Sequence, residues 1–352
     1  MIPNMWYVIL ASREVKAGRM VAVRRFGEKL VAWRTPEGAL SLLADQCPHR
    51  GVAFSGKSEA HDRAALTRNL ATGGPAAARI QDGCLVCPFH GFAFDTVGKC
   101  RAIPANGKTA EPPRGFKAKS YPVREANGFI YAWYGETREE YPPIPWFEAI
   151  GPGYSVTTFF DPWATHYSRG LENQLDVVHL PFVHHNTIGR GNATLVHGPV
   201  VRLEPRPGGH DLMNLWVRNE KDRGQPPLRA AELPVPERHP FLQFLFPNLW
   251  HNWITDKLRL VGAFVPVDEG HMMLYLQTHQ KFLTAPLLRG PVDLMLRYMN
   301  LVIERQDKRI VETQAPKRSD LKGGEQLIPG DGPIIEYRRR RQSLIDAARR
   351  SP

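Results

Sequence analysis

The chain has 352 residues, 42% of them hydrophobic, which is enough to bury a large core and to form two domains. Its four cysteines are too few for a disulfide framework and favour a reducing, cytoplasmic compartment, and no stretch approaches the length of a membrane span. The net charge of +11 could indicate a nucleic-acid partner, but the excess is spread along the chain without a motif of stacking aromatic residues. We therefore expect no nucleic acid and no membrane, and we predict that the basic tail at 336–350 is a solvated helix.

Short apolar runs separated by turn residues extend from Trp6 to about Trp133. This pattern predicts an all-β domain over residues 1–137. The proline-rich segment 141–145 then predicts a domain boundary, because such a sequence is stiff and extended. Beyond it, long β-like runs accompany two helical stretches, so residues 138–352 are predicted to form an α+β domain.

Two short clusters in the all-β region carry side chains that bind metals, Cys47-Pro48-His49 and Cys87-Pro88-Phe89-His90. Together they supply two thiolates and two imidazoles. This is the ligand set of a Rieske-type 2Fe-2S centre, in which two cysteines hold one iron and two histidines hold the other. The alternative is a structural zinc site, which Cys84 keeps open because it forms a Cys-x-x-Cys pair with Cys87.

The sequence around both clusters resembles the two cluster-binding loops of Rieske oxygenases. Residues 47–51 read Cys-Pro-His-Arg-Gly, and residues 87–95 read Cys-Pro-Phe-His-Gly-Phe-Ala-Phe-Asp. The resemblance implies four cluster ligands: Cys47, His49, Cys87 and His90. The 37 residues between the clusters exceed the spacer usual in this family. The excess lies in an insert at 56–83, whose composition predicts a surface excursion.

Residues 172–184 hold the next dense group of metal-binding side chains. Asn173, Asp176 and His179 recur every three residues, so we predict that they share one face of a helix. Pro181 is expected to end that helix and bring His184 back. The order Asn-x-x-Asp-x-x-His-x-x-x-x-His matches the mononuclear-iron motif of Rieske non-haem iron oxygenases, particularly their homo-oligomeric monooxygenase and demethylase branch. His185 is a competing imidazole, but its offset breaks this spacing.

Two histidines and one carboxylate hold iron of this kind and leave positions open, so the carboxylate must be found. Residues 292–314 read as a helix in which Asp307 shares an apolar face with Met299, Ile303 and Ile310. An ionised carboxylate on that face is costly unless it is paired or binds metal. Glu304 and Lys308 are expected to form an exposed pair on another side. The segment 306–314 also resembles the family segment that carries the third ligand, so we predict Asp307, with Glu304 and Glu312 as fallback ligands.

The resemblance extends from Trp6 to Gln314 and has consequences for fold and function. It implies that a helix-grip (START-like) catalytic domain follows the Rieske domain. It also implies a mononuclear Fe(II) that activates O2 with electrons relayed from the 2Fe-2S cluster. Asp176 would bridge His179 to a cluster histidine of a neighbouring subunit in a homotrimer, and Asn173 would position that bridge or the substrate.

The electrons would come from a separate NAD(P)H-dependent reductase, a ferredoxin or both, because the chain has no Gly-x-Gly-x-x-Gly fingerprint. The expected reaction is hydroxylation or oxidative demethylation of a small organic molecule, and aromatic molecules are among the candidates. Alternatives are ring cis-dihydroxylation, a Rieske electron carrier without oxygenase activity, and a non-catalytic zinc protein. The substrate stays unnamed, because the aromatic residues of the second domain are expected to belong to its core. Examples are Phe159, Phe160, Trp250 and Trp253.

Overall fold

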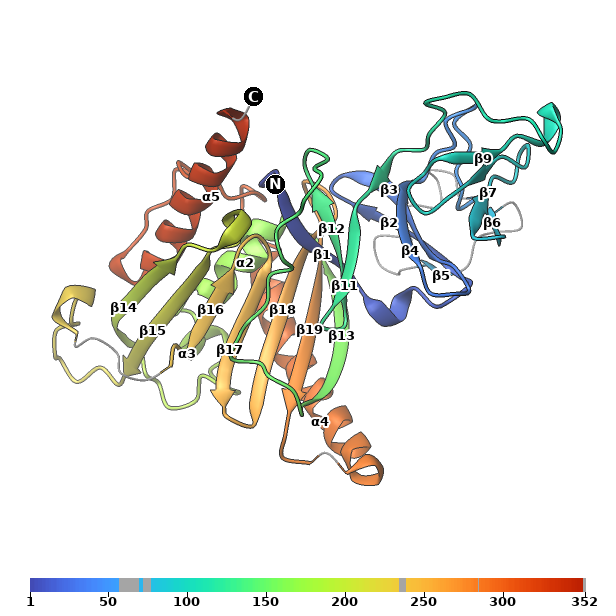
Figure 1. Ribbon diagram of the computed structural model, residues 1–352. Coiled ribbons are helices and arrows are strands. Elements are labelled where there is room, and N and C mark those ends of the chain that lie inside the picture. The colour runs from blue at the N-terminus through green and yellow to red at the C-terminus, as the bar shows by residue number, and fades with distance from the viewer. Residues whose placement is uncertain (57–69, 72–76, 234–238, 284, 351–352) are drawn as a thin grey trace. The chain divides into compact units, whose positions relative to one another are not determined.

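The computed structural model describes residues 1–56, 70–71, 77–233, 239–283 and 285–350 (Figure 1). The chain divides into two compact units. The smaller comprises Trp6–Glu139 and Pro266–Asp268. The larger comprises Met1–Met5, Glu140–Val265 and Glu269–Pro352. The domain limits expected from the sequence, 1–137 and 138–352, stay a prediction.

The N-terminal region is built from three sheets. In the first, strand β1 (Met5–Ala11) pairs with β12 (Phe129–Tyr134), which pairs with β11 (Val123–Ala126). The second has the order β10 (Ser120–Tyr121), β4 (Leu40–Ala44), β3 (Glu28–Arg34), β2 (Met20–Arg25) and β5 (Leu70–Ala71). The third has the order β6 (Arg79–Gln81), β7 (Cys84–Val86), β8 (Ala93–Phe94) and β9 (Cys100–Ala102). The predicted all-β domain is confirmed.

The third sheet and the two cysteine loops share one hydrophobic core. Cys47 and Cys87 lie in it beside the aromatic rings of Phe54 and Phe94. Ala78 is also buried there, and the residues that follow it form β6. The prediction that the whole insert at 56–83 is a surface excursion is therefore wrong at its C-terminal end. Most of the insert, 57–69 and 72–76, lies outside the described residues.

The larger unit is centred on one seven-stranded sheet. Its strand order is β13 (Ser155–Trp163), β19 (Met272–Gln280), β18 (Leu258–Pro266), β17 (Leu249–Thr255), β16 (Leu242–Leu245), β15 (Leu212–Glu220) and β14 (Leu195–Glu204). All nine residues of β19 are buried, which indicates that both faces of this strand are covered.

Four α-helices accompany this sheet in the described part of the chain. They are α2 (Tyr167–Leu175), α3 (Leu180–Val183), α4 (Pro286–Val311) and α5 (Gly332–Arg350). Figure 1 shows α2 and α4 behind the sheet and α5 beside β14. An antiparallel sheet that packs against helices on one side is the architecture expected of a helix-grip domain, so the predicted α+β class is confirmed.

Helix α4 buries a different face from the predicted one. Met299 and Ile310 are 51% and 47% exposed, so the apolar face expected around Asp307 points to solvent over much of its length. The buried residues recur with helical spacing on an adjacent face of α4: Leu296, Asn300, Glu304, Asp307 and Val311. The core-facing side of this helix is polar in its middle, and a rule that searches for apolar residues therefore selects the wrong side.

The predicted exposed pair of Glu304 and Lys308 is likewise wrong. Glu304 is buried. Lys308 instead reaches β13, where its Nζ lies 3.0 Å from Oδ2 of Asp161. Glu304 thus has no lysine partner at the i+4 position and lies on the same buried face as Asp307.

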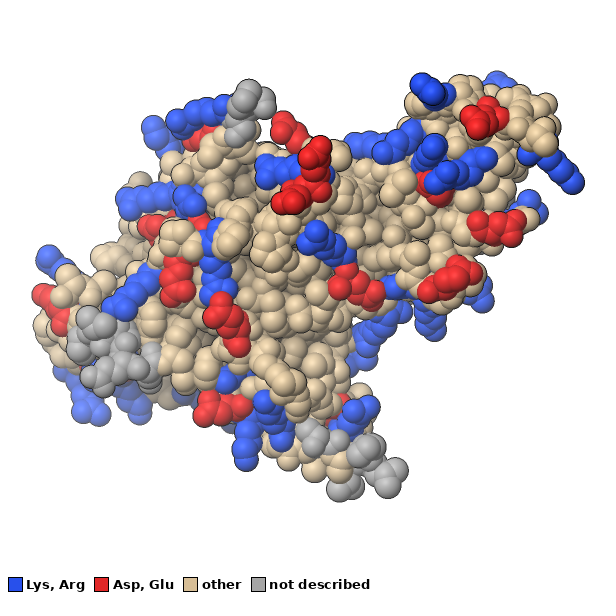
Figure 2. All heavy atoms as spheres, in the orientation of Figure 1, with Lys and Arg blue, Asp and Glu red and all other residues tan. Residues whose placement is uncertain are grey.

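The basic tail forms a helix, α5, but the prediction that it is solvated is wrong for two of its arginines. Arg338 and Arg341 are each 4% exposed, whereas the neighbouring Arg339 is exposed. On the visible face of the molecule, lysine and arginine residues are interspersed with acidic residues rather than gathered in one patch (Figure 2). No helix in the described ranges is both long and apolar enough to span a membrane.

Candidate metal centres and active site

The two cysteine loops have the same backbone design. In the first, the N–H of Cys47 donates to the carbonyl of Val52 (2.8 Å), and the N–H of Gly51 donates to that of Cys47 (2.9 Å). In the second, Cys87 donates to Phe92 (2.8 Å) and Gly91 to Cys87 (3.0 Å). Both glycines have positive φ, 72° and 74°, a conformation that glycine adopts without steric cost. The repeated Cys-x-x-x-Gly spacing therefore sets two matching turns.

These turns separate thiols from imidazoles. Cys47 and Cys87 are buried, whereas His49 and His90 are exposed. The Nδ1 atoms of the two histidines lie 3.2 Å apart, and the ring of His49 stacks on that of Phe92. Burial raises the pKa of Cys47 to about 11, so its thiolate needs a cationic partner to form at neutral pH. Two buried thiols below two outward imidazoles fit the ligand set of a 2Fe-2S centre.

Cys84, the residue that kept a zinc site open, lies apart from this arrangement in strand β7. Burial raises the pKa of its thiol, and the charged groups that act on it include those of Asp95 and Arg101. The charges that act on Cys47 come instead from Cys87 and Cys100. The structure thus gives no support to a zinc site built on Cys84.

The second group of side chains begins where α2 ends. Helix α2 stops at Leu175, and the Oδ1 atom of Asp176 accepts from the N–H groups of Val178 (2.7 Å) and His179 (3.3 Å). Aspartate commonly diverts the backbone from a helix in this way. The prediction of one helical face through His179 is therefore wrong, because the helix has already ended.

The short helix α3 then places both histidines at its ends. His179 is its N-cap residue and His184 its C-cap residue, while Pro181 occupies the first turn, where proline is well tolerated. The expectation that Pro181 ends the first helix is wrong, because α2 has already ended at Leu175 and Pro181 lies within α3, although His184 is brought back beside His179 as expected. The five-residue spacing of the two histidines thus spans one short helix from end to end.

Asp307 completes the group from the buried face of α4. Its Oδ1 atom lies 3.0 Å from Nε2 of His184 and 3.5 Å from Nε2 of His179. The three candidate ligand atoms all lie within 4.8 Å of one another. Metal–ligand bonds of about 2 Å at right angles place their donor atoms about 3 Å apart, so the spacing suits a single metal ion.

The tautomer of His184 is set by a hydrogen-bond chain. Gln306 donates through Nε2 to Asn186 (2.8 Å), and its Oε1 accepts from the hydroxyl of Thr187 (2.8 Å). Because that oxygen lies 2.8 Å from Nδ1 of His184, the imidazole proton is assigned to Nδ1. The lone pair of Nε2 is then directed at Asp307.

His179 has a carboxylate beside it, at an ion-pair distance rather than in a hydrogen bond. Its Nδ1 lies 3.5 Å from Oδ2 of Asp176. Burial opposes ionisation of Asp176, but the interaction with His179 outweighs it and lowers the pKa of this carboxyl. The Nε2 atoms of both histidines and Oδ1 of Asp307 therefore converge on one point. Asp307 raises the pKa of His184 despite the burial of this histidine, so the site favours positive charge beside the carboxylate. A divalent metal ion fits this set of two imidazoles and one carboxylate.

The competing candidates lie elsewhere. His185 is exposed and contacts the carbonyl of Phe182 (3.0 Å). The carboxylate of Glu312 accepts from the N–H of Ala164 (2.7 Å). Glu304 alone is close to the predicted site. Burial, followed by the charge of Asp307, raises its pKa well above the ordinary value. The structure thus brings together His179, His184 and Asp307, and their role as iron ligands stays a prediction.

These side chains line a cavity of about 290 Å³, together with Asn173, Asp176 and Glu304. Sequence reasoning missed other lining residues, and it expected Trp250 to belong to the core. Trp250 is buried but lines this cavity, and Trp253 lines a second cavity of about 380 Å³. No sequence signal marked Trp250, whereas Gln306 could have been found as the neighbour of Asp307 with a side chain suited to orient a ligand.

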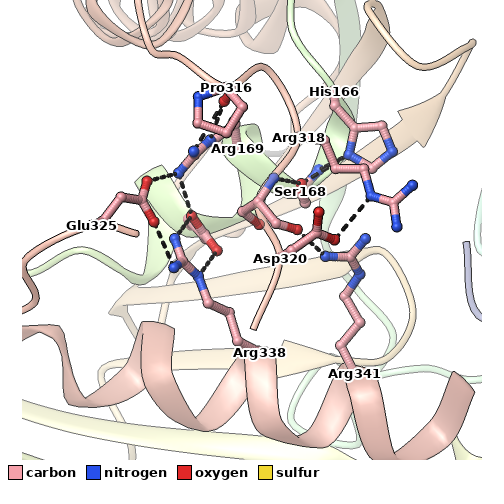
Figure 3. Close-up of polar contacts among 11 residues, drawn as sticks. His166, Ser168, Arg169, Pro316, Arg318, Asp320, Glu325, Arg338 and Arg341 are labelled. Atoms are coloured by element: carbon pink, nitrogen blue, oxygen red, sulfur yellow. Dashed lines mark hydrogen bonds and ion pairs between the residues drawn. The ribbon is translucent and has the colours of Figure 1, made fainter. Parts of the chain in front are cut away.

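An ionic network fixes α2, which leads into the site, to α5 (Figure 3). Arg338 of α5 binds both carboxylate oxygens of Glu172, at 2.6 and 2.9 Å. Arg169 contacts Glu172 (3.2 Å), and both arginines contact Glu325 at 2.6 Å. Glu172 directly precedes Asn173, so the basic tail that was predicted to be solvated supports the cavity wall.

Comparison with models of protein families identifies the family to which the chain belongs. The Rieske 2Fe-2S domain model matches residues 5–122, and the model of the vanillate O-demethylase oxygenase C-terminal domain matches residues 163–347. The chain belongs to the Rieske-type oxygenases. The first match contains both cysteine loops of this Rieske oxygenase, and the second contains His179, His184 and Asp307.

Individual relatives agree with this assignment. The oxygenase subunit of 3-chlorobenzoate-3,4-dioxygenase from Comamonas testosteroni is 29% identical over 284 residues, which cover 77% of this Rieske oxygenase but only 57% of that relative. The crystal structure of dicamba monooxygenase bound to dicamba superposes with a TM-score of 0.69 at 18% identity, covering 99% of this chain and 98% of the other. The oxygenase of a carbazole 1,9a-dioxygenase complex with ferredoxin gives 0.72 at 19% identity, with coverage of 97% and 90%. The structural likenesses establish the shared fold.

Proposed function

We propose that this protein is the terminal oxygenase component of a Rieske system that hydroxylates or oxidatively demethylates a small organic substrate with O2. The observation that carries the proposal is the convergence of two imidazole Nε2 atoms and one carboxylate oxygen beside a small-molecule cavity. The two matched loops supply a candidate electron entry site in the same chain. Neither a simple electron carrier nor a structural zinc protein accounts for the cavity.

The metal groups have separate tasks in this proposal. When bound, the cluster at Cys47, His49, Cys87 and His90 supplies single electrons, and iron at His179, His184 and Asp307 supplies the open positions at which O2 is activated. The remaining residues orient these ligands. Gln306 keeps the proton of His184 on Nδ1, and the Gln174 amide lies 3.5 Å from Oδ2 of Asp307. Asn173 lines the cavity, where it is suited to position the substrate.

A separate electron donor is part of the proposal. Support comes from the absence of a Gly-x-Gly-x-x-Gly sequence in the chain and from the ferredoxin complex of the structurally similar carbazole 1,9a-dioxygenase. We assign this role to a ferredoxin, an NAD(P)H-dependent reductase or both. The four cysteines are free, which favours the reducing cytoplasm as the compartment.

Electron transfer would use a homotrimer in which Asp176 links His179 to a cluster histidine of the next subunit. Two features support this role. The side chain of Asp176 contacts His179 yet stays 28% exposed. His49 and His90 present their rings at the surface of the smaller unit. Each group could therefore meet a partner from another copy of the chain.

The proposal is tested by loading the protein with iron and adding nitric oxide, an O2 substitute whose complex with high-spin ferrous iron gives a half-integer-spin signal in electron paramagnetic resonance. We expect this signal in the wild type and in His185→Ala, and its loss in His179→Ala. If wild-type protein with a full iron content gave no such signal, the proposed oxygenase site would be wrong. With a turned-over substrate, 18O2 then separates the reaction classes. One labelled atom in a hydroxylated product indicates monooxygenation, two indicate dihydroxylation, and an unlabelled demethylated product released together with formaldehyde indicates oxidative demethylation.

A further inference from the structure

The two cavities of the larger unit have largely apolar walls and share several of them. Leu180, Phe241, Leu242 and Ile254 line both. The cavity at the candidate iron ligands adds four more aliphatic residues or rings: Ile188, Trp250, Leu260 and Ile303. The second cavity adds Val177, Val217 and Trp253. A molecule whose reacting group lies near His179 could therefore extend its body along the shared wall into the second cavity.

A small set of polar atoms interrupts the apolar wall of the first cavity. Trp250 Nε1, Asn173 Nδ2 and Asn252 Oδ1 are buried atoms that find no hydrogen-bond partner within the described chain. Trp250 as a whole is only 5% exposed. Buried polar atoms in folded proteins are almost always paired. These three atoms have almost no accessible surface, so a ligand in the cavity pairs with them only when their side chains turn toward it.

The charges beside the first cavity are negative or belong to the metal site. The carboxylates of Asp176 and Asp307 line it, and no lysine or arginine among the described residues lines either cavity. In the proposed iron site, the two positive charges of a ferrous ion are balanced by Asp307 and Asp176. His239 of the second cavity stacks on Trp253, with ring centroids 3.7 Å apart. A carboxylate or sulfonate would lose its hydration here without gaining a lysine or arginine partner from the described lining residues.

We infer that this site selects a neutral, mainly apolar substrate with a hydrogen-bonding group, and that it discriminates against aromatic carboxylates and sulfonates. The inference deepens the proposed function and rests on it for the position of the reacting group. The shape and polarity of the cavities carry the selection itself. Asn173 and Trp250 would donate to an acceptor on the substrate, while Asn252 would accept from a donor.

The test compares two probes of nearly equal size, 2-naphthamide and 2-naphthoate. Their binding to the iron-loaded protein is measured by anaerobic calorimetry at pH 7, where no turnover occurs. We expect 2-naphthamide to bind at least tenfold more tightly. Equal affinity, or tighter binding of 2-naphthoate, would overturn the inference.

Variants of Ile254, which lies in the shared wall and is 43% exposed, locate the binding. Ile254→Trp should weaken 2-naphthamide at least tenfold by filling the space. Ile254→Lys should shift the preference toward 2-naphthoate at least tenfold by supplying the missing cation. Val156→Trp and Val156→Lys are matched controls, because Val156 is similarly exposed but lines neither cavity. If the Ile254 variants behaved like these controls, the probes would bind elsewhere and the inference would fail.

The experiment distinguishes failure of the binding inference from failure of the proposed function. If 2-naphthamide is preferred but no substrate supports oxygen consumption with reductant, the proposed function is wrong and the binding inference stands. If an anionic arene is bound and oxidised in preference to its neutral match, the inference is wrong and the oxygenase function stands.

Discussion

The loop centre at Cys47 and Cys87 and the helix centre at His179, His184 and Asp307 are held in different ways. Each loop closes on itself through hydrogen bonds within six residues, and its glycine permits the turn. The helix centre joins α3 to α4, more than a hundred residues later, and relies on Gln306 and Asp176 to direct its imidazoles. A locally built centre depends on backbone turns, whereas a centre built over long range depends on side chains that orient other side chains.

The most severe test of this difference is Asp307→Ala. Removing the carboxylate leaves two imidazoles without the third ligand, so we expect loss of the mononuclear iron and at least a thousandfold loss of activity. The visible absorption of the cluster should persist, because the loops do not depend on α4. Iron analysis and absorption spectra check both, and Glu312→Ala is the control. Loss of the cluster spectrum together with the iron would show that the two centres are not independent.

Arg338→Ala probes the long-range support of the helix centre. The change leaves Glu172 buried without its bidentate partner, and breaking a buried ion pair typically costs about 3–5 kcal/mol. We expect that loss in the free energy of unfolding of the larger unit, measured by urea denaturation, with the cluster absorption little changed at low urea. Arg339→Ala, one residue along on the exposed side of α5, should stay within about 0.5 kcal/mol of the wild type. Equal effects of the two changes would remove the proposed support.

Acid should lower the unfolding free energy of the larger unit more than that of the smaller one, because the larger unit contains His210. Burial lowers the pKa of His210 to about 4, although its Nδ1 contacts the carbonyl of Phe246. The unfolded chain, with an ordinary histidine pKa, takes up the proton first. This contribution to stability is complete above pH 6.5 and falls by about 3 kcal/mol as the pH drops to about 4.

The check is the slope of unfolding free energy against pH between 6.5 and 4, measured on metal-free protein. His210→Gln should flatten the slope of the larger unit by about 1.4 kcal/mol per pH unit. The smaller unit, which does not contain His210, should keep its slope in this variant. An unaltered slope in His210→Gln would mean that this residue is not the acid-sensitive group.

The smallest expected effect concerns the orientation of His184. Gln306→Ala removes the acceptor of its Nδ1 proton, and losing such an orienting partner typically lowers metal affinity by about 10–100-fold. Competition with a chelator measures this loss at the mononuclear site, and Arg305→Ala on the exposed side of α4 is the control. A loss equally large in Arg305→Ala would indicate a general effect on α4 rather than orientation of the ligand.

The same contrast explains what the sequence could predict. The loop ligands were readable because Cys-Pro-x-His-type turns with a following glycine fix their geometry within a few residues. Asp307 was selected correctly as the carboxylate near the histidines, but on an apolar face that the structure exposes at Met299 and Ile310. The buried side of α4 is polar because it lines a site, and hydrophobic periodicity does not reveal such a face.

Two further misreadings have the same physical origin. The side chain of Asp176 accepts hydrogen bonds from the backbone N–H groups of Val178 and His179, and α2 ends there. The three-residue spacing in the sequence therefore does not place these residues on one helical face. Arg338 is buried because Glu172 and Glu325, distant in sequence, neutralise it. Charge alone predicted solvent exposure, since pairing across long range cannot be read from a single helix. The sequence order is thus most informative where a site is built locally.

Iron-edge anomalous diffraction from crystals of the reconstituted protein tests the central claim most directly. The account predicts two neighbouring irons between the cysteine loops, ligated by Cys47, Cys87, His49 and His90. It also predicts one separate iron at about 2 Å from Nε2 of His179, Nε2 of His184 and a carboxylate oxygen of Asp307. An iron-loaded crystal with no anomalous peak at this triad, or with zinc in place of iron at the loops, would contradict the account.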